Sequence, residues 1–291
     1  MSAGRRTSGD YRRGIGLALA GTVLVSFETL LLRLLHLDIW TVIWWRGALL
    51  GATCVAAALV MGTSLRQLRQ LGIAGLIAIA AFAASVFSFI SAINGTTVAN
   101  TLVIGSAAPL FAALLSWAFL RERVLPATWV AVTLLFLGIA LIFSGSVRTA
   151  FIAGDLFALL YAGCLAAYYV ALRHCSPGHL LLVVAGGGLL SGLLAWPLAA
   201  PAAVSPEDIG LLLGLGVVVV PASTMLLSLG TKHLPAPDVT LIMMLEMLLG
   251  PLWVWLALGE IPAEATVAGG VLILLTVVGH SYVVSGRIAE A

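Results

Sequence analysis

A single acidic residue, Glu246, interrupts an apolar stretch that is long enough to cross a lipid bilayer, residues 240–260. An ionisable side chain at mid-membrane indicates a functional site, because water is absent there and an unsolvated charge is costly. Glu246 could bind the ammonium group of a small molecule or exchange a proton. Its structural alternative is a protonated carboxyl that hydrogen-bonds to neighbouring helices. A weaker copy of this stretch, residues 102–122, also ends in a glutamate, which indicates that the chain is built twice.

Glu28 and Arg46 are predicted to form an ion pair. Each lies about eight residues from the outer end of its apolar segment, or ~12 Å deep at the helical rise per residue. An unpaired charge at that depth is expensive, and a partner relieves the cost. A structural pair near an outer gate is the favoured interpretation. Arg46 could alternatively bind a carboxylate through its planar guanidinium group.

Small polar and aromatic side chains provide further candidates. Ser85 and Ser88 begin a stripe of small polar residues on one side of a predicted helix, which continues at Ser91 and Asn94. Such a stripe could line a cavity or pack helices together. Tyr161, Tyr168 and Trp44 could stack on an apolar or aromatic ligand, and the two tyrosines share a helix face. Three other tryptophans are predicted to be anchors at the outer membrane interface, namely Trp40, Trp253 and Trp255.

The composition requires these residues to sit in a membrane protein. The chain has 291 residues, of which 62% are hydrophobic and 9% are charged, whereas a soluble domain has about 25% charged residues. The sequence has no zinc-protease, serine-hydrolase or nucleotide-binding motif and no metal-ligand cluster. We therefore expect neither an enzyme nor a cofactor, metal or nucleic-acid partner. The expected partners are the lipid bilayer and a small-molecule substrate; the oligomeric state is open, and a monomer would suffice.

Ten membrane-spanning helices are predicted, at residues 14–36, 40–61, 71–93, 98–120, 126–144, 153–173, 178–200, 209–231, 237–258 and 265–285. Cations concentrate on one side of this topology, at Arg5, Arg6, Arg12, Arg13, Arg66, Arg69, Arg121, Arg123, Arg173, Lys232 and Arg287. The other side has only Arg148 in a loop. Positive charge marks the cytoplasmic side. The pattern therefore predicts an even number of spans in a bacterial inner membrane, with both termini in the cytoplasm.

The sequence also predicts an internal repeat. A shift of 138 residues places Asn100 on Asp238 and Glu122 on Glu260. Each half holds five predicted spans, so the halves must be inverted relative to each other. Inverted repeats with a midplane substrate site are typical of secondary transporters. Three Gly-xxx-Gly pairs are interpreted as helix-packing devices, at Gly47/Gly51, Gly188/Gly192 and Gly210/Gly214.

The ends of the repeated segments have more local interpretations. Asn100 and Asp238 are predicted to cap helices near the cytoplasmic side. Glu122 and Glu260 are predicted to organise the loops that follow their helices.

The segments PLFAALLSWAFLRERVLPATWVAVTLLFLGIALIFSG and LEMLLGPLWVWLALGEIPAEATVAGGVLILL resemble the duplicated signature of the drug/metabolite transporter superfamily, EamA branch. The resemblance implies ten helices in two inverted repeats, a central cavity lined by helices 1–4 and 6–9, and peripheral helices 5 and 10. In size and aromatic content the chain is also similar to YddG-type bacterial amino-acid exporters. One departure concerns helix geometry: Pro109 corresponds to Met247, and the nearby proline is Pro251. We therefore expect the two repeats to break their helices one turn apart.

These observations predict an all-α membrane protein with a cytoplasmic tail at residues 1–13 and repeats at residues 14–145 and 153–286. The predicted function is gradient-driven export of amino acids, with aromatic or hydrophobic ones among the candidates, or of similar small metabolites, by alternating access. The alternatives are a carrier of another metabolite class, such as a drug, nucleotide sugar or sugar phosphate, and a non-transporting receptor or scaffold.

Overall fold

The computed structural model describes residues 8–62, 71–120, 126–149, 151–172, 175, 179–202, 204–233, 242–243 and 245–289. Within these ranges the chain is helical and contains no strand. The first half comprises α1 (Ser8–Leu34), α2 (Ile39–Val60), α3 (Gly72–Gly95), α4 (Val98–Gly105), α5 (Ala108–Leu120) and α6 (Pro126–Thr149). The second half comprises α7 (Ile152–Leu172), α8 (Leu180–Ala195), α9 (Pro206–Leu213), the π-helical segment η3 (Gly214–Val219), α10 (Val220–His233), α12 (Glu246–Leu258) and α13 (Glu264–Ala289).

Ten apolar helical segments correspond to the ten predicted spans. Five are long and apolar enough to cross a membrane by length and composition: α1, α2, α3, α7 and the continuous run from α9 into α10. The other five segments of the described chain are shorter. The predicted all-α membrane architecture is confirmed.

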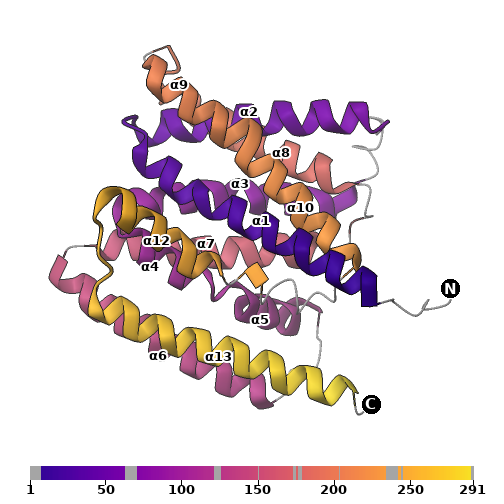
Figure 1. The fold of residues 1–291 in the computed structure, drawn as a ribbon, viewed down its shortest axis with the longest axis vertical. Helices are drawn as coiled ribbons and strands as arrows, with labels where there is room; N and C mark the ends of the chain where they lie inside the picture. The colour runs from indigo at the N-terminus through magenta and orange to yellow at the C-terminus, as the bar shows by residue number, and fades with distance from the viewer. Residues whose placement is uncertain are drawn as a thin grey trace.

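The packing of the helices follows the inverted repeat. Helix α1 packs on α10, and α3 packs on α7. The counterpart of α1 in the second half is α7, and the counterpart of α10 in the first half is α3. The second contact is therefore the repeat of the first. Helices α2 and α8 are counterparts and pack on each other, as do α6 and α13. In Figure 1 the α6–α13 pair runs along one edge of the molecule, so the fifth and tenth spans are peripheral. Both termini lie at the same end of the bundle (Figure 1).

Glycines allow the closest helix contacts. A Cβ atom on Gly47 would lie 2.4 Å from the carbonyl oxygen of Gly188 in the facing helix, which is too close for any side chain. Gly51 and Gly192 also face the partner helix, so the packing role predicted for these two pairs is confirmed. The prediction for Gly210 and Gly214 is wrong: a Cβ atom there would meet nothing within 4 Å.

Each repeat breaks its fourth span at the same place. Between α4 and α5, the Ala107 amide donates to the Ile104 oxygen at 3.1 Å, and the Leu110 amide donates to the Ala107 oxygen at 3.0 Å. A shift of 138 residues reproduces both bonds, because the Leu245 amide donates to Ile242 and the Leu248 amide donates to Leu245, each at 3.0 Å. The expectation of breaks one turn apart is therefore wrong. Pro251 lies inside α12 and does not interrupt it.

Candidate functional site

Glu28 on α1 and Arg46 on α2 form the predicted ion pair. The Nε atom of Arg46 donates to Oε1 of Glu28 at 2.9 Å, and Nη2 makes a very short contact with the same oxygen. Each residue is only 5% exposed. The remaining nitrogen, Nη1 of Arg46, is buried and has no hydrogen-bond partner. The pair is thus neutralised but retains an unused donor, which can serve an anionic group.

Tyr161 on α7 lies between this pair and Glu246. Its hydroxyl is within electrostatic range of Glu246, Glu28 and Arg46, and Glu246 is within electrostatic range of Glu28. Glu246 is the first residue of α12, at the break in the ninth span. The Tyr161 ring packs in a tilted arrangement against Phe89, at a centroid distance of 4.9 Å. Four of the predicted site residues thus lie within electrostatic range of one another, in one region between the two halves.

The Tyr161 ring also contacts the other broken span. A Cβ atom on Gly105, the last residue of α4, would lie 2.7 Å from Cε1 of Tyr161. The absence of a side chain at Gly105 therefore lets the ring lie directly against the end of α4. Both helix breaks, at Ser106–Ala107 and at Leu245, consequently border the region that holds the charged residues.

Tyr169 is a candidate site residue that the sequence analysis missed. It is within electrostatic range of Glu246 and Tyr161, and 42% of its surface is exposed. The signal was present in the adjacent pair Tyr168–Tyr169. Only the first of the two was selected, because it shares a helix face with Tyr161.

Tyr168 and Trp44 lie in different surroundings. Tyr168 is 5% exposed and packs on Phe82, with ring centroids 5.2 Å apart, in a core cluster with Leu71 and Val183. Its shared face with Tyr161 is therefore the face toward α3. Trp44 contacts the rings of Trp45 and Trp196, where α2 meets α8.

The predicted serine stripe is buried in α3. Ser85 donates to the Phe82 carbonyl at 2.7 Å, and Ser88 donates to the Ala84 carbonyl at 2.8 Å. Both hydroxyls are thus used within their own helix, whereas the Ser91 hydroxyl is buried without a partner.

Among the predicted interfacial anchors, Trp253 differs from expectation. It stacks on Phe27 of α1 at 4.9 Å and donates to the Ser26 hydroxyl at 2.9 Å, so it joins α12 to α1.

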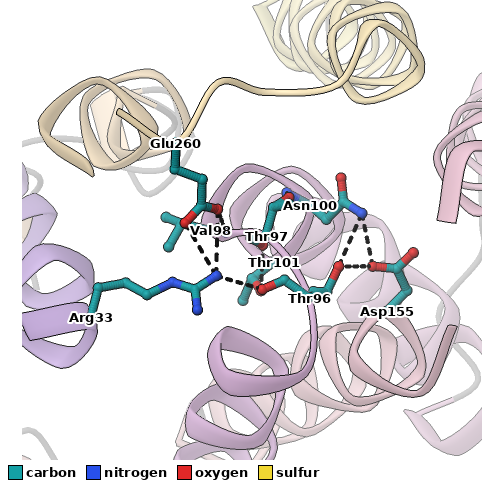
Figure 2. Close-up of polar contacts among 8 residues, drawn as sticks. All are labelled: Arg33, Thr96, Thr97, Val98, Asn100, Thr101, Asp155 and Glu260. Atoms are coloured by element: carbon teal, nitrogen blue, oxygen red, sulfur yellow. Dashed lines mark hydrogen bonds and ion pairs between the residues drawn. The ribbon is translucent and has the colours of Figure 1, made fainter. Parts of the chain in front are cut away.

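A second polar cluster lies at the end of the bundle opposite the termini (Figure 2). The carboxylate of Asp155 on α7 is fully buried, and its Oδ1 accepts from the Thr96 hydroxyl at 2.7 Å and the Asn100 amide at 3.0 Å. Thr266 on α13 donates to Oδ1 of Asn100 in a very short contact. Sequence analysis passed over Asp155, because an acidic residue in the first turn of a helix suits the helix dipole without further explanation.

The helix-cap prediction for Asn100 is wrong. Thr97 caps α4, and its hydroxyl accepts from the Asn100 backbone amide at 3.1 Å. The Asn100 side chain instead joins α4 to the second repeat. Asn100 also lies beside the end of α1 that the charge pattern assigns to the outside, and not near the cytoplasmic side. Its repeat counterpart Asp238, like Glu122, lies outside the described residues.

Glu260 contacts the start of α4 in the first repeat, whereas the prediction was that it organises the loop after its own helix. It accepts from the Val98 backbone amide at 3.0 Å, at the beginning of α4. Arg33 approaches Oε2 of Glu260 at 3.3 Å and donates to the Thr96 carbonyl at 2.7 Å (Figure 2). The ion pair is about one quarter exposed, with side-chain values of 24% and 26%.

Two hollows open on the surface. One, of about 730 Å³, lies between the end of α1 and the start of α9 and includes His36, Glu207 and Asp208. The other, of about 290 Å³, is an apolar groove between α4, α12 and α13 that includes Pro251 and Trp255. Neither hollow is lined by Arg46, Tyr161 or Glu246. In the described part of the chain, no group of three or more His, Cys, Asp or Glu side chains could hold a metal ion.

The comparisons agree with the repeat. A family model described as the EamA-like transporter family matches residues 12–144 and, a second time, residues 152–282. One solved structure, described only as the crystal structure of a protein, covers 92% of this chain and 95% of its own, with 20% sequence identity and a TM-score of 0.64. At that identity the similarity supports the fold alone. No curated protein matches the chain. The finer similarity to YddG-type exporters is not confirmed.

Proposed function

The chain belongs to the EamA-like transporter family, and we propose from this premise that it exports amino acids with apolar or aromatic side chains. As a family member it is a multi-pass membrane transporter of small metabolites. The proposed membrane is the bacterial inner membrane, and the proposed mechanism is alternating access driven by a gradient. In inverted-repeat carriers, rocking of the two halves exposes one midplane site to each side in turn.

One observation carries the amino-acid proposal: the buried, unused Nη1 donor of Arg46. Because Glu28 accepts from Nε and Nη2, Arg46 is held in place with one nitrogen left for a substrate. A guanidinium N–H pairs well with a carboxylate. The α-carboxylate of an amino acid would satisfy this donor without an additional cation in the site.

The carboxylate of Glu246 suits the ammonium end of the same amino-acid substrate. Glu246 is partly exposed and has no cationic partner among the described side chains. A substrate ammonium would neutralise it. Tyr161 and Tyr169, which interact electrostatically with Glu246, would offer their rings to an apolar side chain. A zwitterion with an apolar side chain therefore matches both the charges and the surroundings.

A second candidate is a carrier of cationic, apolar compounds. It is favoured by the balance of charge, because two carboxylates, Glu28 and Glu246, accompany the one arginine of the region. A sugar phosphate matches poorly, since a polyanion needs several cations and Arg46 is already paired.

The test uses proteoliposomes loaded separately with labelled phenylalanine, threonine, a sugar phosphate and a fluorescent apolar cation. Efflux of phenylalanine faster than threonine, with no sugar-phosphate efflux, is the expected result. Efflux of the sugar phosphate alone would contradict the proposal, and efflux of the cation alone would support the second candidate.

Variants then test the named residues. Glu246→Gln should abolish most transport while the protein still elutes as a folded species. Glu264→Gln, a change at an exposed glutamate of α13, should retain transport. Tyr169→Ala should shift the preference away from bulky side chains. Wild-type rates for Glu246→Gln would assign that residue a structural role.

A further inference from the structure

The two halves of the chain are joined by polar contacts at the end of the bundle opposite the termini. Arg33 and Val98 of the first half contact Glu260 of the second. Thr96 and Asn100 of the first half contact Asp155. Farther out, the His36 amide donates to Asp208 at 3.2 Å, and the Ala200 amide donates to the Thr41 hydroxyl at 2.8 Å. In an alternating-access carrier, the contacts that close the substrate path at one end must break when that end opens.

The contacts around Glu260 and Asp155 form two layers, and Figure 2 shows them without Thr266. The surface layer is the Arg33–Glu260 ion pair, which is about one quarter exposed. The inner layer is the network of Thr96, Asn100, Asp155 and Thr266, in which every residue is at most 3% exposed. Thr96 links the layers, because its carbonyl accepts from Arg33 and its hydroxyl donates to Asp155. Opening the surface pair therefore disturbs the buried network.

We propose that these two layers are a gate, which holds the halves together at this end and must open for substrate to pass. Asp155 is its central positioning residue. It receives Thr96 and Asn100 from the first half, while its own helix belongs to the second. The gate lies apart from the region of Arg46 and Glu246, so this inference holds whichever metabolite is carried.

In the closed arrangement, two polar atoms of these layers lack hydrogen-bond partners. Oδ2 of Asp155 and Nε of Arg33 are both buried without a hydrogen-bond partner. A buried polar atom without a partner destabilises the state that buries it. Both atoms would gain water when this end opens. The contacts thus hold the gate closed, and the two unpartnered atoms reduce the difference between the closed and open forms.

The test measures the width of this end directly. Spin labels are attached at His36→Cys and Ile261→Cys, two exposed positions of opposite halves, in a protein whose native cysteines are replaced. Double electron–electron resonance then gives the distribution of distances between the two spin labels, with the protein in lipid nanodiscs. Asp155→Ala and Arg33→Glu should each shift the population toward a longer distance. The exchange Arg33→Glu with Glu260→Arg should restore the short distance, because it restores the ion pair.

Glu207→Gln is the matched control. It removes a negative charge from an exposed position at the same end, outside the network, and should leave the distances unchanged. Since Asp155→Ala could impair folding, Arg33→Glu in the more exposed surface layer provides the independent measurement. Distances that stay as in the wild type for Arg33→Glu, or that shift equally for Glu207→Gln, would overturn the gate. Neither outcome depends on which substrate is transported.

Discussion

At the scale of single residues, the Glu28–Arg46 pair is held together by the cost of separating it. Both side chains are buried, and removal of one partner leaves the other charge without solvent. Breaking such a pair typically costs about 3–5 kcal/mol, whereas replacing both partners costs much less. We therefore expect Arg46→Gln to lower the free energy of unfolding by roughly this amount, and Glu28→Gln with Arg46→Gln to recover most of it.

A double-mutant cycle of denaturant unfolding in detergent measures this coupling. The cycle compares each single variant with the double variant. If the two single effects simply add, the side chains are not coupled and the interpretation of the pair is wrong. Glu264→Gln, at an exposed position, serves as the control for the loss of a carboxylate.

Asp38 caps helix α2 in the loop that follows α1. Its Oδ1 accepts from the Trp40 and Thr41 amides, each at 3.0 Å. Burial by itself would raise the pKa of Asp38, but hydrogen bonds from Thr41 and Trp40 hold it below the ordinary value. A lowered pKa in the folded state stabilises the protein above the unfolded-state value, and this stability is lost as the pH falls through the folded value.

Asp38→Ala is therefore expected to cost about 1 kcal/mol at neutral pH, the typical value of an N-cap. The difference from wild type should shrink below about pH 4, where the carboxyl becomes protonated. Asp38→Asn should remain close to wild type at neutral pH, because asparagine caps helices as well as aspartate does. Unfolding curves recorded across this pH range give the measurement. A deficit in Asp38→Ala that is independent of pH would contradict the role of the charge.

At the scale of helices, a Gly-xxx-Gly pattern is informative only where it faces another helix. Gly47 does so, and a Cβ atom there would meet the Gly188 backbone at 2.4 Å. A backbone cannot rotate away as a side chain can, so Gly47→Ala should cost about 1–3 kcal/mol or more through overpacking. Gly210→Ala is the control, since it meets nothing within 4 Å. It should be neutral or stabilising by up to ~1 kcal/mol through helix propensity. If thermal unfolding shows a similar loss of stability in both variants, the contact with the facing helix does not explain the effect of Gly47→Ala.

The position of each span was predictable from hydrophobicity, but only one of the two internal breaks was. The break at Ala107 lies just before Pro109, which has no backbone amide to bond the Gly105 carbonyl one turn earlier. The break at Leu245 has no such proline after it, because Pro251 lies inside α12. Leu245 also has no side chain that disfavours a helix. Tertiary contacts must therefore maintain the second break, and a single sequence does not reveal such contacts.

At the scale of the whole molecule, the inverted repeat was predictable because two independent patterns agreed. The shift of 138 residues related the halves, and the odd number of spans in each half required inversion. Glu28 and Arg46 were paired correctly, because neighbouring helices placed them at similar depths. Arg33 and Glu260, separated by 227 residues, gave no such signal. Their contact, like that of Asp155 with Asn100, exists only because the inverted halves meet at one end of the bundle.

The orientation of this bundle in the membrane gives the last prediction. Both termini lie at one end (Figure 1), while Ala202 lies in the connection between α8 and α9 at the other. Nearly all loop cations are on the side of the termini, and such loops stay in the cytoplasm. A phosphatase that is active only outside should therefore be active when fused at Ala202 and inactive at the C-terminus. A fluorescent protein that folds only inside should give the opposite pattern. If the phosphatase is active at the C-terminus, the charge argument fails, and the gate around Asp155 would control the cytoplasmic entrance.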